Sequence, residues 1–180
     1  MRVVAGTARG RTLVAPPGAR TRPTTDRVRE AVFNALWSRG AVEDAEVVDL
    51  FAGSGALGVE ALSRGAAHVT FVDRDRAARY AIRRNLEVCG FVDRATIVEV
   101  PVEPWLAALG DDVHFDLAFC DPPYSFAGWV DLLASVPAEL VVAEAAAAVP
   151  LPGGWSLARE SRYGGTWVGF LVREPAAEAG

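Results

Sequence analysis

The chain has 180 residues, of which 51% are hydrophobic and 23% charged, so it is expected to form one main domain with at most a small appendage. No apolar run approaches the roughly 20 residues that a membrane-spanning helix needs, and arginines interrupt the start before a signal peptide could form. The net charge is −5, but residues 1–30 hold seven arginines and two acidic residues, so a basic front precedes an acidic remainder.

The basic front predicts a β-hairpin, with residues 2–5 and 11–14 flanking a turn that contains Gly6 and Gly10. After a break at residues 15–18, a helix is expected to begin near residues 24–26, where hydroxyl and carboxylate side chains can cap it. Its apolar residues recur at helical spacing: Val28, Ala31, Val32, Ala35 and Leu36. We therefore expect a basic hairpin extension over residues 1–22 and a main domain over residues 23–180.

From residue 46 onward, short apolar strands alternate with helical stretches, which is typical of a parallel sheet covered on both faces. Residues 155–159 and 166–172 have no helix between them, so they predict an antiparallel hairpin at the sheet edge. The fold class is thus α/β, with a Rossmann-like, mostly parallel sheet. Other strands are expected near 46–50, 68–73, 96–100, 115–120 and 140–144, and helices near 56–64, 76–88, 103–109 and 127–135.

A glycine-rich loop follows the first of these strands. Gly53, Gly55 and Gly58 match the G-x-G-x-x-G spacing, with a strand before them and a helix after them. Asp73, at the end of the next strand, lies 20 residues past Gly53, where a carboxylate accepts hydrogen bonds from ribose hydroxyls. The pattern predicts a nucleoside cofactor. The alternative is that the glycines serve only a tight strand-to-helix turn.

Asp49 helps to distinguish between a dinucleotide and S-adenosylmethionine as the nucleoside cofactor. It stands at the strand tip just before the loop, where a dinucleotide would place its pyrophosphate, and a carboxylate there opposes a phosphate. S-adenosylmethionine carries an ammonium and a sulfonium instead. Asp49 favours this methyl donor if its side chain faces the loop; the alternative is that it points away, and the prediction of S-adenosylmethionine rests on Asp49 together with the turn described next.

The most informative residues are Asp121-Pro122-Pro123-Tyr124, which follow the apolar run 115–120. Two consecutive prolines stiffen the turn, because each fixes its own φ and restricts the residue before it. The Asp121 carboxylate and the Pro122 carbonyl are two acceptors, and the Tyr124 ring is a flat surface for stacking. This set suits an amino group on a planar nucleobase. The alternative is an ordinary turn at the end of a strand.

Metal chemistry finds no support in the sequence. Cys89, Cys120, His68 and His114 are isolated from one another, so neither a disulfide framework nor a metal cluster is predicted. We expect a cytoplasmic, monomeric protein without a metal.

Taken together, these motifs resemble the class I S-adenosylmethionine-dependent methyltransferases that modify exocyclic amines. More narrowly, the chain resembles the bacterial 16S rRNA (guanine(966)-N2)-methyltransferase family, RsmD. The segments that carry this resemblance are Arg2-Val3-Val4-Ala5-Gly6, Arg9-Gly10-Arg11, residues 22–30 (RPTTDRVRE) and residues 49–58 (DLFAGSGALG).

The resemblance implies methyl transfer to the N2 amine of a guanine in 16S rRNA that already carries ribosomal proteins. It implies that Asp121, Pro122, Pro123 and Tyr124 are catalytic. Residues 100–103 (VPVE) lie where the family often has a small polar residue near the adenine, so the contact of Val102 and its neighbours would rest on backbone and apolar packing alone. The remaining cofactor-binding residues would be Asp49, Phe51, Ala52, Gly53, Ser54, Gly55 and Asp73, and the RNA-binding residues Arg2, Arg9, Arg11, Arg20, Arg22 and Arg27.

Three other functions stay open at this point. A DNA adenine-N6 methyltransferase would use the same turn, although no separate base-recognition domain is evident. A dinucleotide-binding oxidoreductase or regulator would satisfy the glycine spacing alone. A non-catalytic RNA-binding protein, or a solvated arm without a partner, would account for the basic front.

Overall fold

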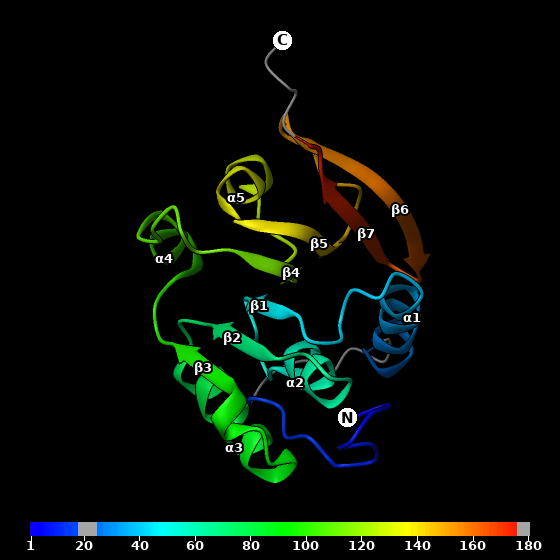
Figure 1. Ribbon diagram of the computed structural model, residues 1–180, viewed down its shortest axis with the longest axis vertical. Coiled ribbons are helices and arrows are strands. Elements are labelled where there is room, and N and C mark those ends of the chain that lie inside the picture. Colours follow the sequence, from blue (N-terminus) through cyan, green and yellow to red (C-terminus); the bar gives the residue numbers. More distant parts are fainter. Residues whose placement is uncertain (18–24, 176–180) are drawn as a thin grey trace.

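The computed structural model describes residues 1–17 and 25–175. Seven strands and five α-helices alternate through most of this part of the chain (Figure 1). The helices are α1 (Thr25–Trp37), α2 (Ala56–Ser63), α3 (Arg76–Cys89), α4 (Val102–Ala107) and α5 (Trp129–Ser135), with a short 3-10 helix, η1 (Val92–Arg94). The strands are β1 (Glu46–Leu50), β2 (His68–Val72), β3 (Ala95–Val98), β4 (Phe115–Cys120), β5 (Ala138–Ala145), β6 (Trp155–Tyr163) and β7 (Thr166–Arg173).

The strands form one sheet in the order β3-β2-β1-β4-β5-β7-β6. Strands β1 to β5 are parallel, whereas β7 runs antiparallel between β5 and β6. The predicted α/β class, the parallel sheet and the antiparallel hairpin at its edge are therefore confirmed. The order of the parallel strands reverses between β1 and β4, and open α/β sheets bind ligands at such a point, beyond the carboxyl ends of the strands.

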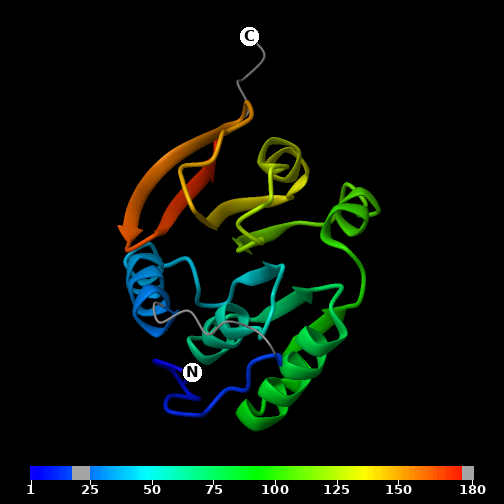
Figure 2. The ribbon, with the colours of Figure 1, turned by 180° about the vertical axis from the view of Figure 1, so that it is seen from behind.

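Alternate residues of the central strands point to opposite faces of the sheet, and both faces are buried. Val47 of β1 packs in a first apolar cluster with residues of α1, α2 and α3, and Val48 packs in a second cluster with residues of α4 and α5. The two groups of helices accordingly lie on opposite sides of the sheet (Figure 2). Burial on both faces explains why these strands are nearly continuous apolar runs.

The N-terminal segment, residues 1–17, pairs more briefly than the sequence predicts. Instead of two strands, it forms a single antiparallel bridge between Arg2 and Thr12. The amides of Val4 and Ala5 donate to the Glu60 carboxylate of α2, at 2.7 and 3.0 Å, and so cannot extend a ladder. The predicted antiparallel pairing of residues 2–5 with residues 11–14 is therefore present, but it is limited to one bridge and the backbone hydrogen bonds beside it, because the Glu60 side chain binds the amides of Val4 and Ala5.

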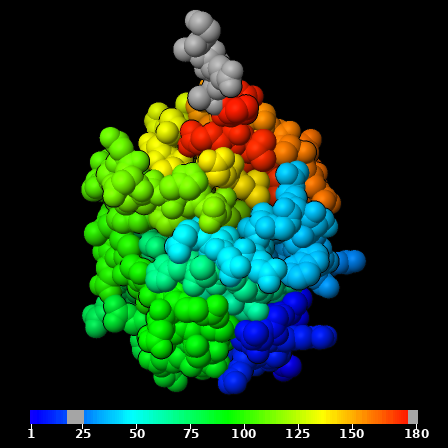
Figure 3. Space-filling model, viewed as in Figure 1, coloured from blue at the N-terminus to red at the C-terminus, as the bar shows by residue number. Residues whose placement is uncertain are grey.

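This segment also contributes to the core. Val3, Ala8 and Leu13 are buried in the first apolar cluster, and the segment packs on the body of the molecule at one corner (dark blue in Figure 3). In the part of the chain that the structure describes, no helix combines the length and hydropathy needed to cross a bilayer.

Candidate active site

Two loops with distinctive sequences meet at one edge of the sheet. Strands β1 and β4 are parallel neighbours in which Leu50 pairs with Cys120, so Phe51 and Asp121 follow on adjacent strands at the same edge. The rings of Phe51 and Phe126 pack with centroids 5.4 Å apart. The start of the glycine loop is therefore in contact with the segment that directly follows the Asp-Pro-Pro-Tyr turn.

The glycine loop is held in a sharp turn by its own backbone. Gly53 and Gly55 have φ of 57° and 72°, values that glycine adopts readily because it has no Cβ. Phe51 also has a positive φ, of 59°, which costs a non-glycine residue about 1–3 kcal/mol and is found mostly at functional sites. The Gly55 amide donates to the Ala52 carbonyl at 2.7 Å and closes the turn.

The third glycine of the motif serves packing. A Cβ built on Gly58 would lie 2.3 Å from Cε1 of Phe71 and 2.8 Å from Cγ1 of Val69, both on β2. Only glycine lets α2 approach the sheet this closely. Gly58 thus fixes the helix that follows the loop, and the loop itself depends on that placement.

Asp73 joins the end of β2 to the glycine loop. Its Oδ2 accepts a hydrogen bond from the Gly53 amide at 2.8 Å, and its Oδ1 accepts one from the Asp75 amide at 2.8 Å. A carboxylate offers about four lone-pair sites, so both oxygens keep acceptor capacity for a hydroxyl group. Asp73 is thus placed beside the loop with its orientation fixed.

Asp49 lies at the tip of β1 and is buried, with 2% of its surface exposed. Its Oδ2 accepts from the Gly58 amide at 3.0 Å, in the first turn of α2, where Gly55 supplies no capping side chain. Burial raises the pKa of Asp49 well above its ordinary value. The hydrogen bond from Gly58 opposes this shift, while the nearby carboxylates of Asp121, Asp73 and Glu144 add to it.

Carboxyl groups from four strands therefore gather at this edge. Asp49, Asp73, Asp121 and Glu144 lie at or just beyond the carboxyl ends of β1, β2, β4 and β5. Sequence reasoning missed Glu144, although it lies in the strand predicted at residues 140–144, because only the pairing of Cys120 with Ala143 shows which end of that strand reaches the site. Such a set favours a cationic ligand over a pyrophosphate.

The Asp-Pro-Pro-Tyr turn is stiff and partly exposed. Pro122 is buried, whereas Pro123 and Tyr124 are exposed. The Phe126 amide donates to the Pro123 carbonyl at 2.8 Å, which closes the turn. The Tyr124 hydroxyl lies 2.9 Å from Oγ1 of Thr166 in β7, a contact that no local sequence signal predicts.

Val102 is placed at the start of α4, directly after Pro101. It is buried in the second apolar cluster together with Leu50 and Val72, the last residues of β1 and β2. Val102 therefore packs beside the carboxyl ends of β1 and β2.

Four of the six arginines predicted to bind RNA are described and exposed: Arg2, Arg9, Arg11 and Arg27. Arg20 and Arg22 lie outside the described residues. Arg29 also belongs to the basic front, but it is buried, with 3% exposure, and its guanidinium contacts Asp26, the Arg2 carbonyl and Glu60. The Arg29 guanidinium is therefore engaged inside the protein, where it holds the N-terminal segment to α1 and α2.

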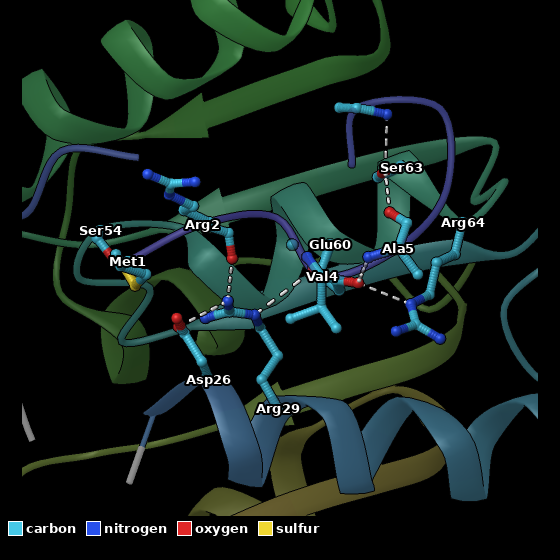
Figure 4. A network of polar contacts seen from close by, with 12 residues as sticks. Met1, Arg2, Val4, Ala5, Asp26, Arg29, Ser54, Glu60, Ser63 and Arg64 are labelled. Carbon is cyan, nitrogen blue, oxygen red and sulfur yellow. Dashed lines mark hydrogen bonds and ion pairs between the residues drawn. The ribbon is translucent and has the colours of Figure 1, made fainter. Parts of the chain in front are cut away.

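Glu60 is the centre of that attachment (Figure 4). It is fully buried on α2, and besides the amides of Val4 and Ala5 it contacts Arg64 Nε at 2.8 Å and Arg29 Nε at 3.5 Å. Nearby, Ser63 Oγ donates to the Ala5 carbonyl at 2.5 Å. A buried charge is tolerated when it is paired and hydrogen-bonded. Glu60 meets that condition with partners from α1, α2 and the N-terminal segment.

The same segment is also tied to the glycine loop. Asn85 of α3 is buried, and its amide group donates to the carbonyls of Val14 and Ser54, at 3.0 and 2.8 Å. Its Oδ1 accepts from the Val14 amide at 2.8 Å. The N-terminal segment and the glycine loop are therefore held by one side chain.

The thiols and the metal-ligand residues give no sign of further chemistry. Burial raises the pKa of Cys120, with Asp49 and Asp121 adding to the shift, so its thiol stays protonated and packs in the core. Within residues 1–17 and 25–175, no three His, Cys, Asp or Glu side chains are grouped so that they could hold a metal ion.

Comparison with known proteins agrees with this geometry. Residues 1–172 match the model of the family described as Conserved hypothetical protein 95. The chain is 36% identical to Ribosomal RNA small subunit methyltransferase D of Escherichia coli, over 99% of this chain and 93% of that protein. It is 35% identical to the protein of the same name from Haemophilus influenzae, over 91% of this chain and 89% of that one.

A solved structure shows the same fold. The structure of yhhF, a candidate methyltransferase of Escherichia coli, superimposes with a TM-score of 0.85 at 35% identity and covers 97% of this chain and 98% of that one. The chain therefore belongs to the family described as Conserved hypothetical protein 95, the RsmD family of class I methyltransferases.

Proposed function

We propose that this protein transfers the methyl group of S-adenosylmethionine to the N2 amine of a guanine in 16S rRNA. One observation carries the proposal: the pairing of Leu50 with Cys120 places the glycine loop and the Asp-Pro-Pro-Tyr turn side by side at one edge of the sheet. A methyl donor held by the first and a base amine held by the second would meet there. The names of the relatives support methylation of the ribosomal RNA of the small subunit, and the choice of the guanine N2 amine is the further step of this proposal.

The residues at the glycine loop fit the methyl donor. Phe51, Ala52, Gly53, Ser54 and Gly55 would line the donor. A Cβ on Gly53 would meet only the Phe51 carbonyl oxygen, at 3.9 Å, so its backbone is open to a ligand, whereas Gly55 gives the loop room against Ile82 and Phe71. Asp73 would accept hydrogen bonds from the ribose hydroxyls, and Asp49 would face the positively charged methionine end. Val102 would contact the adenine through its apolar surface. The four carboxylates at this edge oppose a pyrophosphate, which disfavours the dinucleotide-binding alternative.

The Asp-Pro-Pro-Tyr turn would act on the acceptor. S-adenosylmethionine supplies a methyl group bound to a positively charged sulfur. The guanine amine is a weak nucleophile because its lone pair is delocalised into the ring. The Asp121 carboxylate and the Pro122 carbonyl would accept hydrogen bonds from its two N–H groups, turn the nitrogen toward the methyl group and favour the positive charge that develops there. The carbon–sulfur bond would break as the carbon–nitrogen bond forms, S-adenosylhomocysteine would leave, and the methylated nitrogen would then lose one proton. Pro123 would keep the turn rigid, and Tyr124 would stack on the base, a contact worth about 1–3 kcal/mol.

The N-terminal segment would contact RNA outside the reacting base. In this proposal, residues 1–22 form a basic extension and residues 23–180 the methyltransferase domain. Arg2, Arg9, Arg11 and Arg27 are exposed and would bind phosphates, together with Arg20 and Arg22. The attachment of the segment through Glu60 and Asn85 would fix these charges relative to the glycine loop. We infer a monomer that acts in the cytoplasm on a small subunit already carrying ribosomal proteins.

The decisive experiment offers labelled S-adenosylmethionine with small ribosomal subunits lacking the mark, with naked 16S rRNA and with duplex DNA, followed by nucleoside analysis. Label in N2-methylguanosine from subunits is the expected result. Label in N6-methyladenine from DNA would replace this proposal with the DNA adenine-N6 methyltransferase, which could use the same turn. Calorimetry with S-adenosylmethionine and with NAD tests the cofactor separately.

A further inference from the structure

The hydrogen bond between Tyr124 and Thr166 joins the turn after β4 to the start of β7, a strand that is distant in sequence and is separated from β4 in the sheet by β5. We propose that Thr166 is a positioning residue of the methyl-transfer site, whose hydroxyl holds the phenol of Tyr124 so that the ring face is presented to the target base. This inference rests on the proposed function, because it assigns a partner to the residue that would stack on guanine.

The topology explains why β7 can reach the site. Its neighbour β5 is parallel to β4, and β7 is antiparallel to β5, with Trp167 paired to Ala145. The first residues of β7 therefore lie at the edge where the parallel strands end. Thr166 is the first residue of β7, so the turn from β6 to β7 delivers it to the same edge as Asp121.

Thr166 is a rigid partner. It is buried, with 5% exposure, and it pairs with Tyr163 across the hairpin. The next residue, Trp167, is buried in the second apolar cluster, and its Nε1 donates to Glu160 at 2.6 Å. Threonine is β-branched, so its χ1 angle is restricted. The position of the hydroxyl is thus determined by the hairpin.

Tyr124 is the more exposed member of the pair. Its surface is 47% exposed, and the 2.9 Å contact to Thr166 lies at the far end of its side chain. A hydrogen bond at that end limits rotation about both side-chain torsions. The ring would then be oriented before the base arrives, and less freedom would be lost when the base binds.

The test is a double-mutant cycle on small ribosomal subunits lacking the mark, with kcat and KM measured for Thr166→Val, Tyr124→Phe and the double variant. If the two hydroxyls act only through each other, each single variant loses about fivefold in kcat/KM, which is the order that one net hydrogen bond contributes, and the double variant loses no more. The loss should lie mainly in KM for the subunit. Thr166→Ser keeps the hydroxyl and should restore most of the activity, while the dissociation constant for S-adenosylmethionine stays unchanged in all variants.

Several results would overturn the proposal. Full activity in Tyr124→Phe would overturn the proposal, whatever the result for Thr166→Val. Because Tyr124 is exposed, we expect Tyr124→Phe to fold, so the test remains valid even if Thr166→Val does not fold. Losses that multiply in the double variant, or no recovery in Thr166→Ser, would show that Thr166 acts through the fold alone. A wild-type protein that methylates no guanine would overturn the proposed function and this proposal together, whereas an active wild type with multiplying losses overturns this proposal only.

Discussion

The backbone amide of Gly53 donates a 2.8 Å hydrogen bond to Oδ2 of Asp73, which joins the loop after β1 to the end of β2. The other oxygen of Asp73 accepts from the Asp75 amide. One carboxylate thus sets the shape of the loop and, in the proposed function, also receives the ribose of the methyl donor. Structure and binding therefore depend on the same two oxygens.

Replacing Asp73 by Asn tests this double role. An Asn side chain has one oxygen and one NH₂ group, so it cannot accept from both the Gly53 and Asp75 amides. We expect the dissociation constant for S-adenosylmethionine to rise by about tenfold or more, because at least one charged hydrogen bond of roughly 1.5–3 kcal/mol is lost. Isothermal titration calorimetry measures it. Asp75→Asn is the matched control, since Asn caps helices as well as Asp does and should leave affinity nearly unchanged.

Asp121→Ala separates catalysis from donor binding. The change removes the acceptor that we propose orients the guanine amine, so methyl transfer should fall to background in an assay with labelled donor. Affinity for S-adenosylmethionine should stay within about threefold of wild type, because the glycine loop and Asp73 are untouched and one long-range charge contributes little. A variant that no longer binds the donor would show that Asp121 belongs to the cofactor site.

Asp49 should give the protein a characteristic dependence of stability on pH. Burial raises the native pKa of Asp49 above its ordinary value of 3.8, so the native state keeps a proton that the unfolded chain has lost. The contribution of this group is therefore fully present at low pH and is lost as pH rises through the native pKa. Denaturant unfolding of wild type and Asp49→Asn should show wild type losing stability relative to the variant as pH rises from about 4. A constant difference across that range would contradict the raised pKa.

Binding of the donor should reverse this shift. A sulfonium or ammonium near Asp49 favours the ionised carboxylate, so binding should release a proton below the native pKa, and wild-type affinity should rise with pH. Calorimetry in buffers of different ionisation enthalpy measures the released proton. Asp49→Asn should release none from this position.

Gly6 and Gly10 form a matched pair for testing the N-terminal segment. Both have φ near 80°, so alanine is strained at either position by about 1–2 kcal/mol. A Cβ on Gly6 would also lie 1.8 Å from the Ser63 carbonyl oxygen, whereas one on Gly10 meets nothing within 4 Å. Gly6→Ala should therefore displace the segment from α2 and lower methylation of subunits far more than Gly10→Ala does. Equal effects would mean that the contact with Ser63 does not hold the segment for RNA binding.

Arg9 tests the phosphate contacts. Arg9→Ala should weaken binding to the small subunit and lower the slope of log K against log salt by about 0.7–0.9, the value for one lost phosphate contact. Filter binding over a series of salt concentrations measures this slope. Arg83→Ala is the control, because Arg83 is exposed on α3 and pairs with Glu99. An unchanged slope in Arg9→Ala would remove Arg9 from the RNA-contacting set.

Features that depend on local sequence pattern could be predicted before the fold was known. Apolar periodicity located the strands and helices to within a few residues, since a strand buried on both faces must be apolar throughout and a docked helix must be apolar on one side. The glycine spacing and the paired prolines located the two loops, because each motif restricts its own backbone. The family followed from these motifs and from the basic front.

Contacts between residues that are distant in the chain could be established only from the folded structure. The adjacency of β1 and β4 brought Phe51 and Asp121 to one edge, and the antiparallel course of β7 brought Thr166 to Tyr124. Glu60 accepts hydrogen bonds from the N-terminal amides, which limits the pairing of that segment. Together with Asp26 it also forms ion pairs with the buried Arg29. The sequence does not show whether an arginine faces solvent or pairs with a buried carboxylate. A charge is buried only where another charged or polar group pairs with it, and for Arg29 that group is Glu60, which only the fold brings close.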